Sequence, residues 1–506
     1  MMKPVYIILL GALCAPATLA AATWIPSFSG FDSSAVSSDQ NNAGSPGLNL
    51  PELGDVSATV LTPIDEKRIG DQIMRDVLSS DEVVSDVEIN DYVQALGYRL
   101  ASNGPDKRQQ FNFFVVQDNT INAFALPDGV IGVHTGLIIA ANNESELASV
   151  LGHEIGHVVQ HHLARVLAQQ KQDTIINIAA FALGILAARA NPQLGTGALT
   201  AASAGAVQKQ LDYTREHEQE ADRVGLQILD SGGFDVRAMP AFFETLQRGT
   251  RFVEGSAPSF LRTHPVTSER IADVRGRVEQ MQYKQVPDSA EFQYIRAKLL
   301  ANLSSPSFAI SVFQGNLQEK RYTNEAAQHY GLAQALLRKP DVDGASKQLQ
   351  WLRANAPRHP MFETLAAKIE VARNNPEQAA RLYATGLTMF PGHKALIYGY
   401  AEHFLATNQQ DKGLQFIEEK QSLYPDDAYL YELKSRAYTT QGKTMLRHQA
   451  QGEAYFRRFD TEKAVEQMEL AAKAADGDFY QQSIVEARLK ELKLLVVEPK
   501  KTGFFN

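Results

Sequence analysis

The feature that most constrains this chain is the pentapeptide His153-Glu154-Ile155-Gly156-His157, which reads H-E-x-x-H. On an α-helix, residues four positions apart lie on the same face, so the two imidazoles can point at one position in space. Two neutral imidazoles at this spacing can bind Zn²⁺, and the glutamate between them can act as general base on a metal-bound water. The motif therefore predicts a metal-dependent hydrolase whose site is built on a helix.

The flanking sequence predicts that helix. At about 100° per residue, the apolar positions that follow Ser145 form one stripe, with His153 and His157 on the opposite side. Two core histidines beside a solvated glutamate remain the alternative until a third ligand is found. The stripe consists of Leu147, Leu151, Ile155, Val158, Val159, Leu163 and Val166.

A second helical stretch carries the candidate acidic ligand. Glu218 and Asp222 are four residues apart and share a face, whereas Glu220 is rotated from that face by about 160°. We assign Glu218 as the third metal ligand. Asp222 suits an acceptor that fixes a ligand histidine through its other ring nitrogen, and it is also a candidate proton donor. An ordinary acidic helix surface is the alternative.

Small residues occur at matching positions in both helical stretches. Gly152 and Gly156 flank the histidines, each directly preceding one of them, and Ala221 and Gly225 are four apart in the second stretch. Glycine inside a helix costs about 1 kcal/mol relative to alanine, so its presence requires a reason. We expect the two helices to lie in close contact, which would let a short glutamate side chain reach the ion.

The segment before the metal motif predicts a small sheet. Phe111 to Val116 and Val130 to Val133 are typical of strands, and Asn122 to Leu126 is followed by a turn at Pro127-Asp128-Gly129. We expect a hairpin or small sheet that leads directly into the metal helix. A free edge of this sheet can hold an extended peptide by its backbone, and plain core strands are an equal alternative.

The N-terminus predicts a secretory signal peptide over residues 1–22. A lysine precedes the apolar run Val5 to Leu13, and Ala20 to Ala22 supply small residues for cleavage. The run is too short to span a bilayer. Cys14, the only cysteine, lies inside this segment. The mature chain would therefore contain no thiolate ligand and no catalytic thiol.

The remaining organisation follows from length, charge and composition. A chain of 506 residues suggests about three domains, and a formal charge of −9 without a basic patch predicts no nucleic-acid partner. The expected parts are the signal peptide, a flexible linker at 23–60, a zinc metallopeptidase domain at 61–285 and a repeat domain at 286–500.

Two stretches after the metal motif have unusual composition. Thr174 to Ala188 is almost wholly apolar but short for a membrane span, and 191–207 is rich in glycine and alanine. They suggest a helix followed by a mobile loop near the site. Burial in the core is the favoured interpretation, and peripheral contact with a membrane is the alternative.

The C-terminal half has a period of 34 residues. A helix-turn-helix period of this length resembles the tetratricopeptide repeat, whose units stack into a solenoid with a concave binding face. Further units are expected around residues 429–438 and 456–472, in looser register, and an irregular helical bundle is the alternative. The recurring positions are Pro357, Pro391 and Pro425; Ala345, Ala379 and Gly413; Leu349, Tyr383 and Ile417; and Ala333, Ala367 and Ala401.

The metal motif, with its surroundings, resembles the glutamate-ligand zinc metallopeptidases that include the CAAX prenyl endopeptidases and the HtpX-like membrane proteases. The resemblance covers roughly residues 64–281. It implies a mainly α fold, in which a gluzincin-type metallopeptidase domain of helices plus a small sheet binds one Zn²⁺ per chain and cuts internal peptide bonds. It rests on His153-Glu154-x-x-His157 with Glu218-x-x-x-Asp222, on Asn122-Ala123-Phe124-Ala125 with Gly129-x-Ile131-x-Val133-x-x-Gly136-Leu137, and on Thr263-His264-Pro265-x-x-x-x-Arg270-Ile271.

His264 is a further candidate member of the predicted site. Pro265 favours an extended conformation for it, outside a helix. It can be a fourth, displaceable zinc ligand that keeps the enzyme latent, or a donor to the oxyanion, and a structural loop histidine is an equal alternative. His161 is expected one turn further along the first helix, and it is assigned a structural role, as are His162 and His217.

The order of signal peptide, zinc protease and repeat array resembles a family of bacterial periplasmic proteases that act in outer-membrane β-barrel assembly and quality control. This resemblance implies unfolded or stalled outer-membrane proteins as substrates, and the outer-membrane assembly machinery as partner of the repeats. We therefore expect a periplasmic zinc endopeptidase with Glu154 as general base. The alternative is a chaperone or adaptor that acts mainly through its repeat groove, with a latent protease domain.

Overall fold

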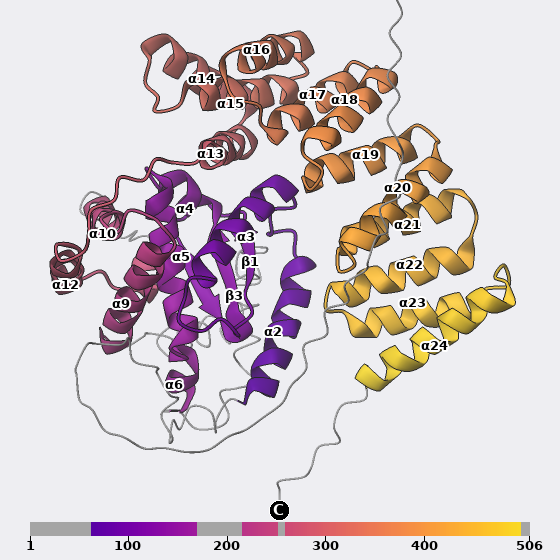
Figure 1. The fold of residues 1–506 in the computed structure, drawn as a ribbon, viewed down its shortest axis with the longest axis horizontal. Coiled ribbons are helices and arrows are strands. Elements are labelled where there is room, and N and C mark those ends of the chain that lie inside the picture. Colours follow the sequence, from indigo (N-terminus) through magenta and orange to yellow (C-terminus); the bar gives the residue numbers. More distant parts are fainter. Residues whose placement is uncertain (1–61, 169–214, 251–258, 497–506) are drawn as a thin grey trace, which may run out of the picture. The chain divides into compact units, whose positions relative to one another are not determined.

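The computed structural model describes residues 62–168, 215–250 and 259–496, which form a mainly helical protein with one small sheet (Figure 1). The fold class predicted from the sequence is confirmed. Within these residues, no helix combines the length and the apolar character needed to cross a bilayer. Outside them lie the predicted signal peptide (1–22), the linker (23–60) and the stretches at 174–188 and 191–207.

The sheet has three strands in the order β1-β3-β2. β1 (Asn112–Val116) runs parallel to β3 (Val130–His134), and β2 (Ala123–Leu126) runs antiparallel to it. The turn η1 (Pro127–Gly129) joins β2 to β3 through Asp128, whose φ of 61° is left-handed.

The two edges of this sheet differ. Segment 82–84 covers the edge of β1, since Val84 N donates to Val115 O at 2.9 Å and Gln117 N donates to Glu82 O at 2.7 Å. No strand among the described residues pairs with the outer edge of β2. The sheet therefore presents β2 as its open edge.

The helix that carries the metal motif, α5 (Glu144–Val159), does not follow the sheet directly. The short helix α4 (Thr135–Ala140) lies between β3 and α5, so the prediction of a direct connection is wrong. Asn143 caps α5 by accepting a hydrogen bond from Glu146 N at 2.9 Å, because the first N–H groups of a helix have no partner within it.

The first helix also ends earlier than its apolar stripe predicted. α5 stops at Val159, and α6 (His162–Ala168) begins after a break at Gln160 and His161. His161 has a φ of 52°, a left-handed conformation that an α-helix cannot contain. The expectation that His161 continues the first helix is therefore wrong, and this residue is exposed.

The predicted close contact between two helices is confirmed. α9 (Arg215–Ser231) packs along α5, and Figure 1 shows the two helices side by side. A Cβ added to Gly225 would lie 2.9 Å from the backbone nitrogen of His153, and one added to Gly156 would lie 2.9 Å from Ala221 O. The backbones touch, so glycine is required at these positions.

Helices α2 (Pro63–Leu78) and α3 (Val87–Ala101) precede the sheet. α10 (Ala238–Thr250), α11 (Ser259–Thr263) and α12 (Ser268–Val278) follow α9 and complete the surroundings of α5. Large apolar side chains that are buried in this part include Leu100, Phe113, Ile131, Leu151, Phe242, Phe243 and Phe260.

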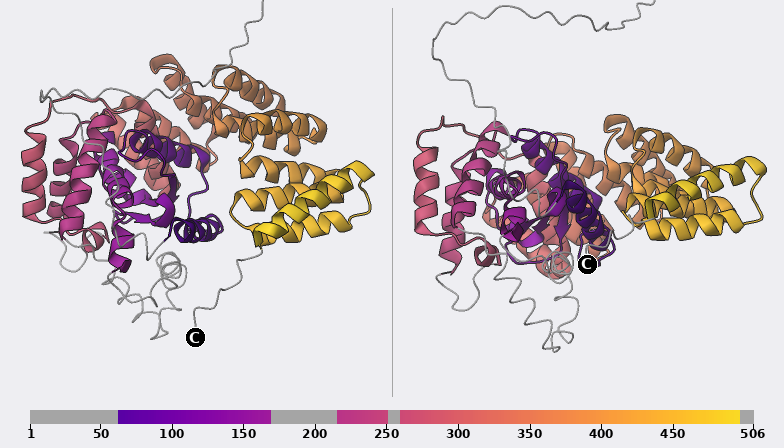
Figure 2. Two further views of the ribbon diagram at one scale, coloured as in Figure 1. Left: turned by 60° about the horizontal axis from the view of Figure 1, so that its bottom comes forward. Right: turned by 90° about the horizontal axis from the view of Figure 1, so that it is seen from below.

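From residue 290 onward the chain forms antiparallel helix pairs that stack in sequence (Figure 2). The small and bulky residues that recur every 34 positions are buried, and the predicted repeat is confirmed. The stretches 429–438 and 456–472, where further units were predicted, lie in the helices α21 to α23. The helices are α13 (Ala290–Leu303), α14 (Pro306–Glu319), α15 (Glu325–Arg338), α16 (Val342–Asn355), α17 (Pro360–Ala372), α18 (Pro376–Met389), α19 (Lys394–Ala406), α20 (Gln410–Leu423), α21 (Ala428–Thr440), α22 (Thr444–Arg457), α23 (Thr461–Lys473) and α24 (Phe479–Val496).

A buried polar cluster joins α3 to the helical repeats. Glu88, at the start of α3, accepts two hydrogen bonds from the helical repeats. Lys298 Nζ on α13 donates to it at 2.5 Å, and Thr364 Oγ1 on α17 donates to it at 2.7 Å. His393 Nε2, just before α19, lies 3.1 Å from the same carboxylate. Lys298 also reaches Asp86 at 2.6 Å. Since Glu88 and Lys298 are both buried, each charge depends on the other for compensation.

Candidate metal centre

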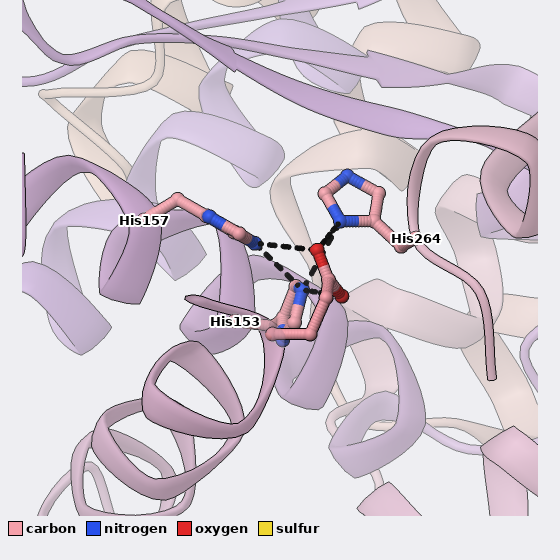
Figure 3. A group of neighbouring side chains, drawn as sticks. His153, His157 and His264 are labelled. Carbon is pink, nitrogen blue, oxygen red and sulfur yellow. Dashed lines mark hydrogen bonds and ion pairs between the residues drawn. The ribbon is translucent and has the colours of Figure 1, made fainter. Parts of the chain in front are cut away.

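Four buried side chains from three separate segments converge at one position. His153 and His157 come from α5, Glu218 from the first turns of α9, and His264 from the residue after α11. Figure 3 shows the three histidine rings directed toward one point. Each of the four offers one ligand atom, and these atoms all lie within 4.8 Å of one another.

Four of the separations between these atoms are close to those around a tetrahedral metal ion. His153 Nε2 lies 3.0 Å from His157 Nε2 and 3.4 Å from His264 Nδ1. Glu218 Oε1 lies 3.5 Å from His157 Nε2 and 2.9 Å from His264 Nδ1. Ligands about 2.1 Å from a tetrahedral zinc ion are about 3.4 Å apart, so this donor set fits such an ion.

One side of the cluster is fixed by a carboxylate and a guanidinium. His153 Nδ1 lies 2.9 Å from Asp222 Oδ1, which leaves Nε2 with its lone pair directed at the cluster. Arg270 donates from Nε and Nη2 to the two oxygens of Asp222, both at 2.7 Å. Its Nη1 also lies 2.6 Å from Glu218 Oε2. Asp222 thus lies behind the His153 ring, where it can orient the ring.

The pKa values of these groups follow from burial and from their partners. Burial lowers the pKa of His153, but Asp222 and Glu218 outweigh it and raise the pKa to about 9. Burial lowers the pKa of His157 to about 3. Burial raises the pKa of Glu218, but the surrounding histidines outweigh this effect and hold it well below its usual value. The carboxylate is therefore charged and available as a ligand.

Glu154 lies beside the cluster and is fully buried. Its Oε1 is 3.5 Å from His264 Nε2, too long for a strong hydrogen bond. Burial raises the pKa of the Glu154 carboxyl, and the neighbouring rings of His264 and His153 lower it only in part. A raised pKa makes the carboxylate a stronger proton acceptor, as a general base requires.

His264 follows α11 without continuing it, as Pro265 predicted. Its ring stacks on Phe260, with centroids 4.8 Å apart and an interplanar angle of 30°. Its backbone nitrogen donates to Phe260 O at 2.7 Å, which anchors the residue to the end of α11. The ring therefore has a defined position within the cluster.

Three residues near the cluster were given no role, or a different one, by the sequence. Arg270 was recognised only as part of a motif, although it contacts both carboxylates of α9. His162 was assigned a structural role, yet its Nδ1 lies 2.9 Å from His157 Nδ1. Glu220 faces away from the cluster, as its helical position predicted, but it contacts His162 at 3.1 Å. The spacing of Arg270 from His264-Pro265 was the available signal.

Comparison with protein families agrees with both halves of the chain. Residues 88–278 match the model of peptidase family M48. Residues 370–437 match a tetratricopeptide repeat model. The first match contains all four side chains of the cluster and Glu154, and the second lies among the stacked helix pairs.

The similar proteins include enzymes that match over most of their length. A β-barrel assembly-enhancing protease of Escherichia coli is 30% identical over 452 residues, which cover 88% of this chain and 91% of that protein. A putative β-barrel assembly-enhancing protease of Vibrio cholerae is 31% identical over 447 residues, covering 88% and 92%. A mitochondrial metalloendopeptidase of Arabidopsis thaliana is 32% identical over 157 residues, covering 31% and 29%.

Proposed function

This chain is a metallopeptidase that belongs to peptidase family M48, and from this membership we propose that it is a zinc endopeptidase of the bacterial periplasm. Its substrates in this proposal are unfolded or stalled outer-membrane proteins, as suggested by relatives that are named β-barrel assembly-enhancing proteases. The observation that carries the proposal is a buried set of four donor atoms that could hold one metal ion, beside the buried carboxylate of Glu154.

His153, His157 and Glu218 would hold one Zn²⁺ per chain, since two neutral imidazole nitrogens and a carboxylate oxygen are typical of catalytic zinc sites. The ion, when bound, lowers the pKa of water and polarises the scissile carbonyl. Glu154 accepts a proton from the attacking water and delivers it to the leaving nitrogen. Asp222 holds the His153 ring during these steps, and Arg270 fixes Asp222.

The open edge of β2 is the proposed binding site for the substrate backbone. An extended peptide can add to such an edge through main-chain hydrogen bonds that require no particular sequence. β2 lies next to α5. A hydrogen bond from the backbone amide of Ala125 lowers the pKa of the Glu154 carboxyl. A peptide on this edge would therefore pass close to the general base.

His264 supports a latent form of the enzyme. As a fourth protein ligand, its Nδ1 would occupy the position that a catalytic zinc site keeps for water or substrate. A cavity of about 30 Å³ beside His157, lined in part by Ala125 and Glu66, has room for a water molecule but not for a peptide. In this proposal His264 must leave the cluster before a substrate can bind.

The general-base role is tested by Glu154→Gln in the full-length protein. We expect bound zinc to remain and cleavage of unfolded casein to fall by about 10²-fold or more, because general-base catalysis contributes about 10²–10⁴-fold. Glu279→Gln is the matched control, since it makes the same change at an exposed residue of the same domain. Equal casein cleavage by Glu154→Gln and the wild type would refute the assignment.

The second candidate function is a chaperone or adaptor that works through the repeats, and the four-ligand arrangement with His264 favours it. In cells that require the protein for outer-membrane assembly, Glu154→Gln separates the two functions. Failure to complement supports proteolysis. Full complementation supports the chaperone or adaptor, with the assembly machinery as partner of residues 286–500.

The proposed periplasmic location has its own test. The mature protein recovered from the periplasm should lack residues 1–22, and an N-terminal sequence of that protein would show whether they have been removed.

A further inference from the structure

The break between α5 and α6 brings a further histidine onto the metal cluster. On a continuous helix, a residue five positions after His157 would be rotated from it by about 140° and would point elsewhere. The left-handed His161 ends the first helix, and α6 then starts at His162. As a result His162 Nδ1 lies 2.9 Å from His157 Nδ1, with both rings buried.

The hydrogen-bond directions along this contact are set by the cluster itself. If His157 Nε2 directs its lone pair at an ion, then His157 Nδ1 carries the hydrogen and donates it to His162 Nδ1. A neutral His162 then has its own hydrogen on Nε2, which lies 3.1 Å from Glu220 Oε2. Arg165 Nη1 donates to the same carboxylate oxygen at 3.1 Å. Every donor in this chain of contacts meets an acceptor.

The position of His162 is also fixed by its neighbours. Its ring stacks on His217 with centroids 4.6 Å apart and an interplanar angle of 28°. Its side chain is fully buried, whereas Glu220 and Arg165 are partly exposed. The contacts thus lead from the buried ligand His157 to a carboxylate and a guanidinium near the surface.

We propose that His162 is a positioning residue that holds the ring of His157 in the orientation and tautomer required for binding the metal ion. The inference rests on the metal site proposed above. A group that accepts a hydrogen bond from the free N–H of a metal-binding histidine fixes that ring, and its loss typically weakens metal affinity by about 10–100-fold. Glu220 contacts the other ring nitrogen of His162, and Arg165 donates to Glu220, so both support the position of His162.

Two amide variants distinguish positioning from packing. The oxygen of asparagine at 162 can occupy the place of Nδ1 and still accept from His157, whereas glutamine reaches Nε2 and leaves His157 Nδ1 without its acceptor. We expect His162→Gln to weaken zinc affinity by about 10–100-fold and His162→Asn to weaken it much less. A packing role predicts the opposite order, because asparagine leaves the larger cavity.

The measurement is the zinc dissociation constant of the full-length protein, by competition with a chromophoric chelator, together with the melting temperature of the metal-free protein. Equal affinity of His162→Gln and the wild type, or equal losses in both variants, would overturn the proposal. If the variants do not fold, Glu220→Ala tests the same chain of contacts near the surface. A several-fold loss of affinity supports the proposal, and no loss contradicts it.

The outcome for the wild type separates this inference from the proposed function. Failure of the wild-type protein to bind zinc would remove the metal site itself, whatever the variants do. Tight binding by the wild type with unchanged affinity in the variants would remove only the role of His162.

Discussion

The α5–α9 contact and the helical repeats both place small residues between packed helices, but these residues meet different neighbours. A Cβ added to Gly225 would lie 2.9 Å from the backbone nitrogen of His153, which cannot move without moving the His153 ring. A Cβ added to Gly413, on α20 of the repeats, would lie 3.2 Å from side-chain atoms of Phe404 and Leu405. The comparison teaches that the α5–α9 contact needs a fixed backbone distance, whereas the repeats tolerate small adjustments of side chains.

The two regions also differ in how they use buried charge. Around the cluster, Glu218, Asp222 and Arg270 are all buried and compensate one another. The apolar clusters of the repeats consist mainly of alanine, leucine, isoleucine and tyrosine, and buried charged groups such as Glu363 and Lys420 pair with exposed partners. A change at the centre should therefore have a large and local effect, and a change in the repeats a small one.

The largest expected effect is that of Arg270→Gln. It leaves the carboxylates of Asp222 and Glu218 without their cation, and breaking a buried ion pair from one side costs about 3–5 kcal/mol. We expect this loss in the free energy of unfolding of the metal-free protein, measured in urea. Arg275→Gln, an exposed change on the same helix, should cost less than about 1 kcal/mol. Similar losses in both variants would contradict the difference between centre and surface.

A pair of glycine variants tests the comparison directly. Gly225→Ala should cost about 1–3 kcal/mol, because its Cβ would overlap the backbone of α5. Gly413→Ala should be neutral, or stabilising by up to about 1 kcal/mol, since alanine favours helices. Ala345 and Ala379 occupy the equivalent repeat position and are fully buried. Melting temperatures of the two variants that shift equally downward would show that the regions do not differ.

The smallest expected effect concerns the contact between the regions. Burial raises the pKa of Glu88, but Lys298 and His393 outweigh it and bring the pKa well below its usual value of 4.5. As the pH falls, Glu88 is therefore protonated at a higher pH in the unfolded chain than in the folded protein. The free energy of unfolding falls as the pH drops below about 4.5, by up to about 1.4 kcal/mol per pH unit.

Glu88→Gln removes this ionisation. It also leaves the buried Lys298 with Asp86 as its remaining partner, so the variant is less stable at neutral pH and only the pH dependence of stability is compared. We expect the melting temperature of the wild type to fall more steeply than that of Glu88→Gln between about pH 4.5 and pH 3. Glu419→Gln, an exposed change in the repeats, serves as control and should follow the wild type. Parallel curves for Glu88→Gln and the wild type would show that this carboxylate does not link the two regions.

Much of this structure could be predicted because it depends on local periodicity. The spacing of His153 and His157, the shared face of Glu218 and Asp222, and the 34-residue period all follow from the geometry of single helices. The glycines also predicted one contact between distant segments, because glycine destabilises a helix and is expected there only where another backbone lies close.

The rest could not be predicted because it depends on non-local contacts or on one backbone angle. His161 is not glycine, so its residue type did not predict the left-handed conformation that ends α5 and changes the direction of His162. Arg270 reaches α9 from α12, and Glu88 meets side chains more than 200 residues away. Such ion pairs leave no period in the sequence.

In the proposed mode of substrate binding, the open edge of β2 has a consequence for which proteins are cut. An edge can add a strand only from a chain whose own amides and carbonyls are unpaired. In a finished barrel both sides of every strand are paired, so completion of the barrel itself would remove the substrate. Cleavage would then depend on how long a strand remains unpaired before the neighbouring strand adds to it. An enzyme of this kind would act as a timer of folding without recognising any sequence.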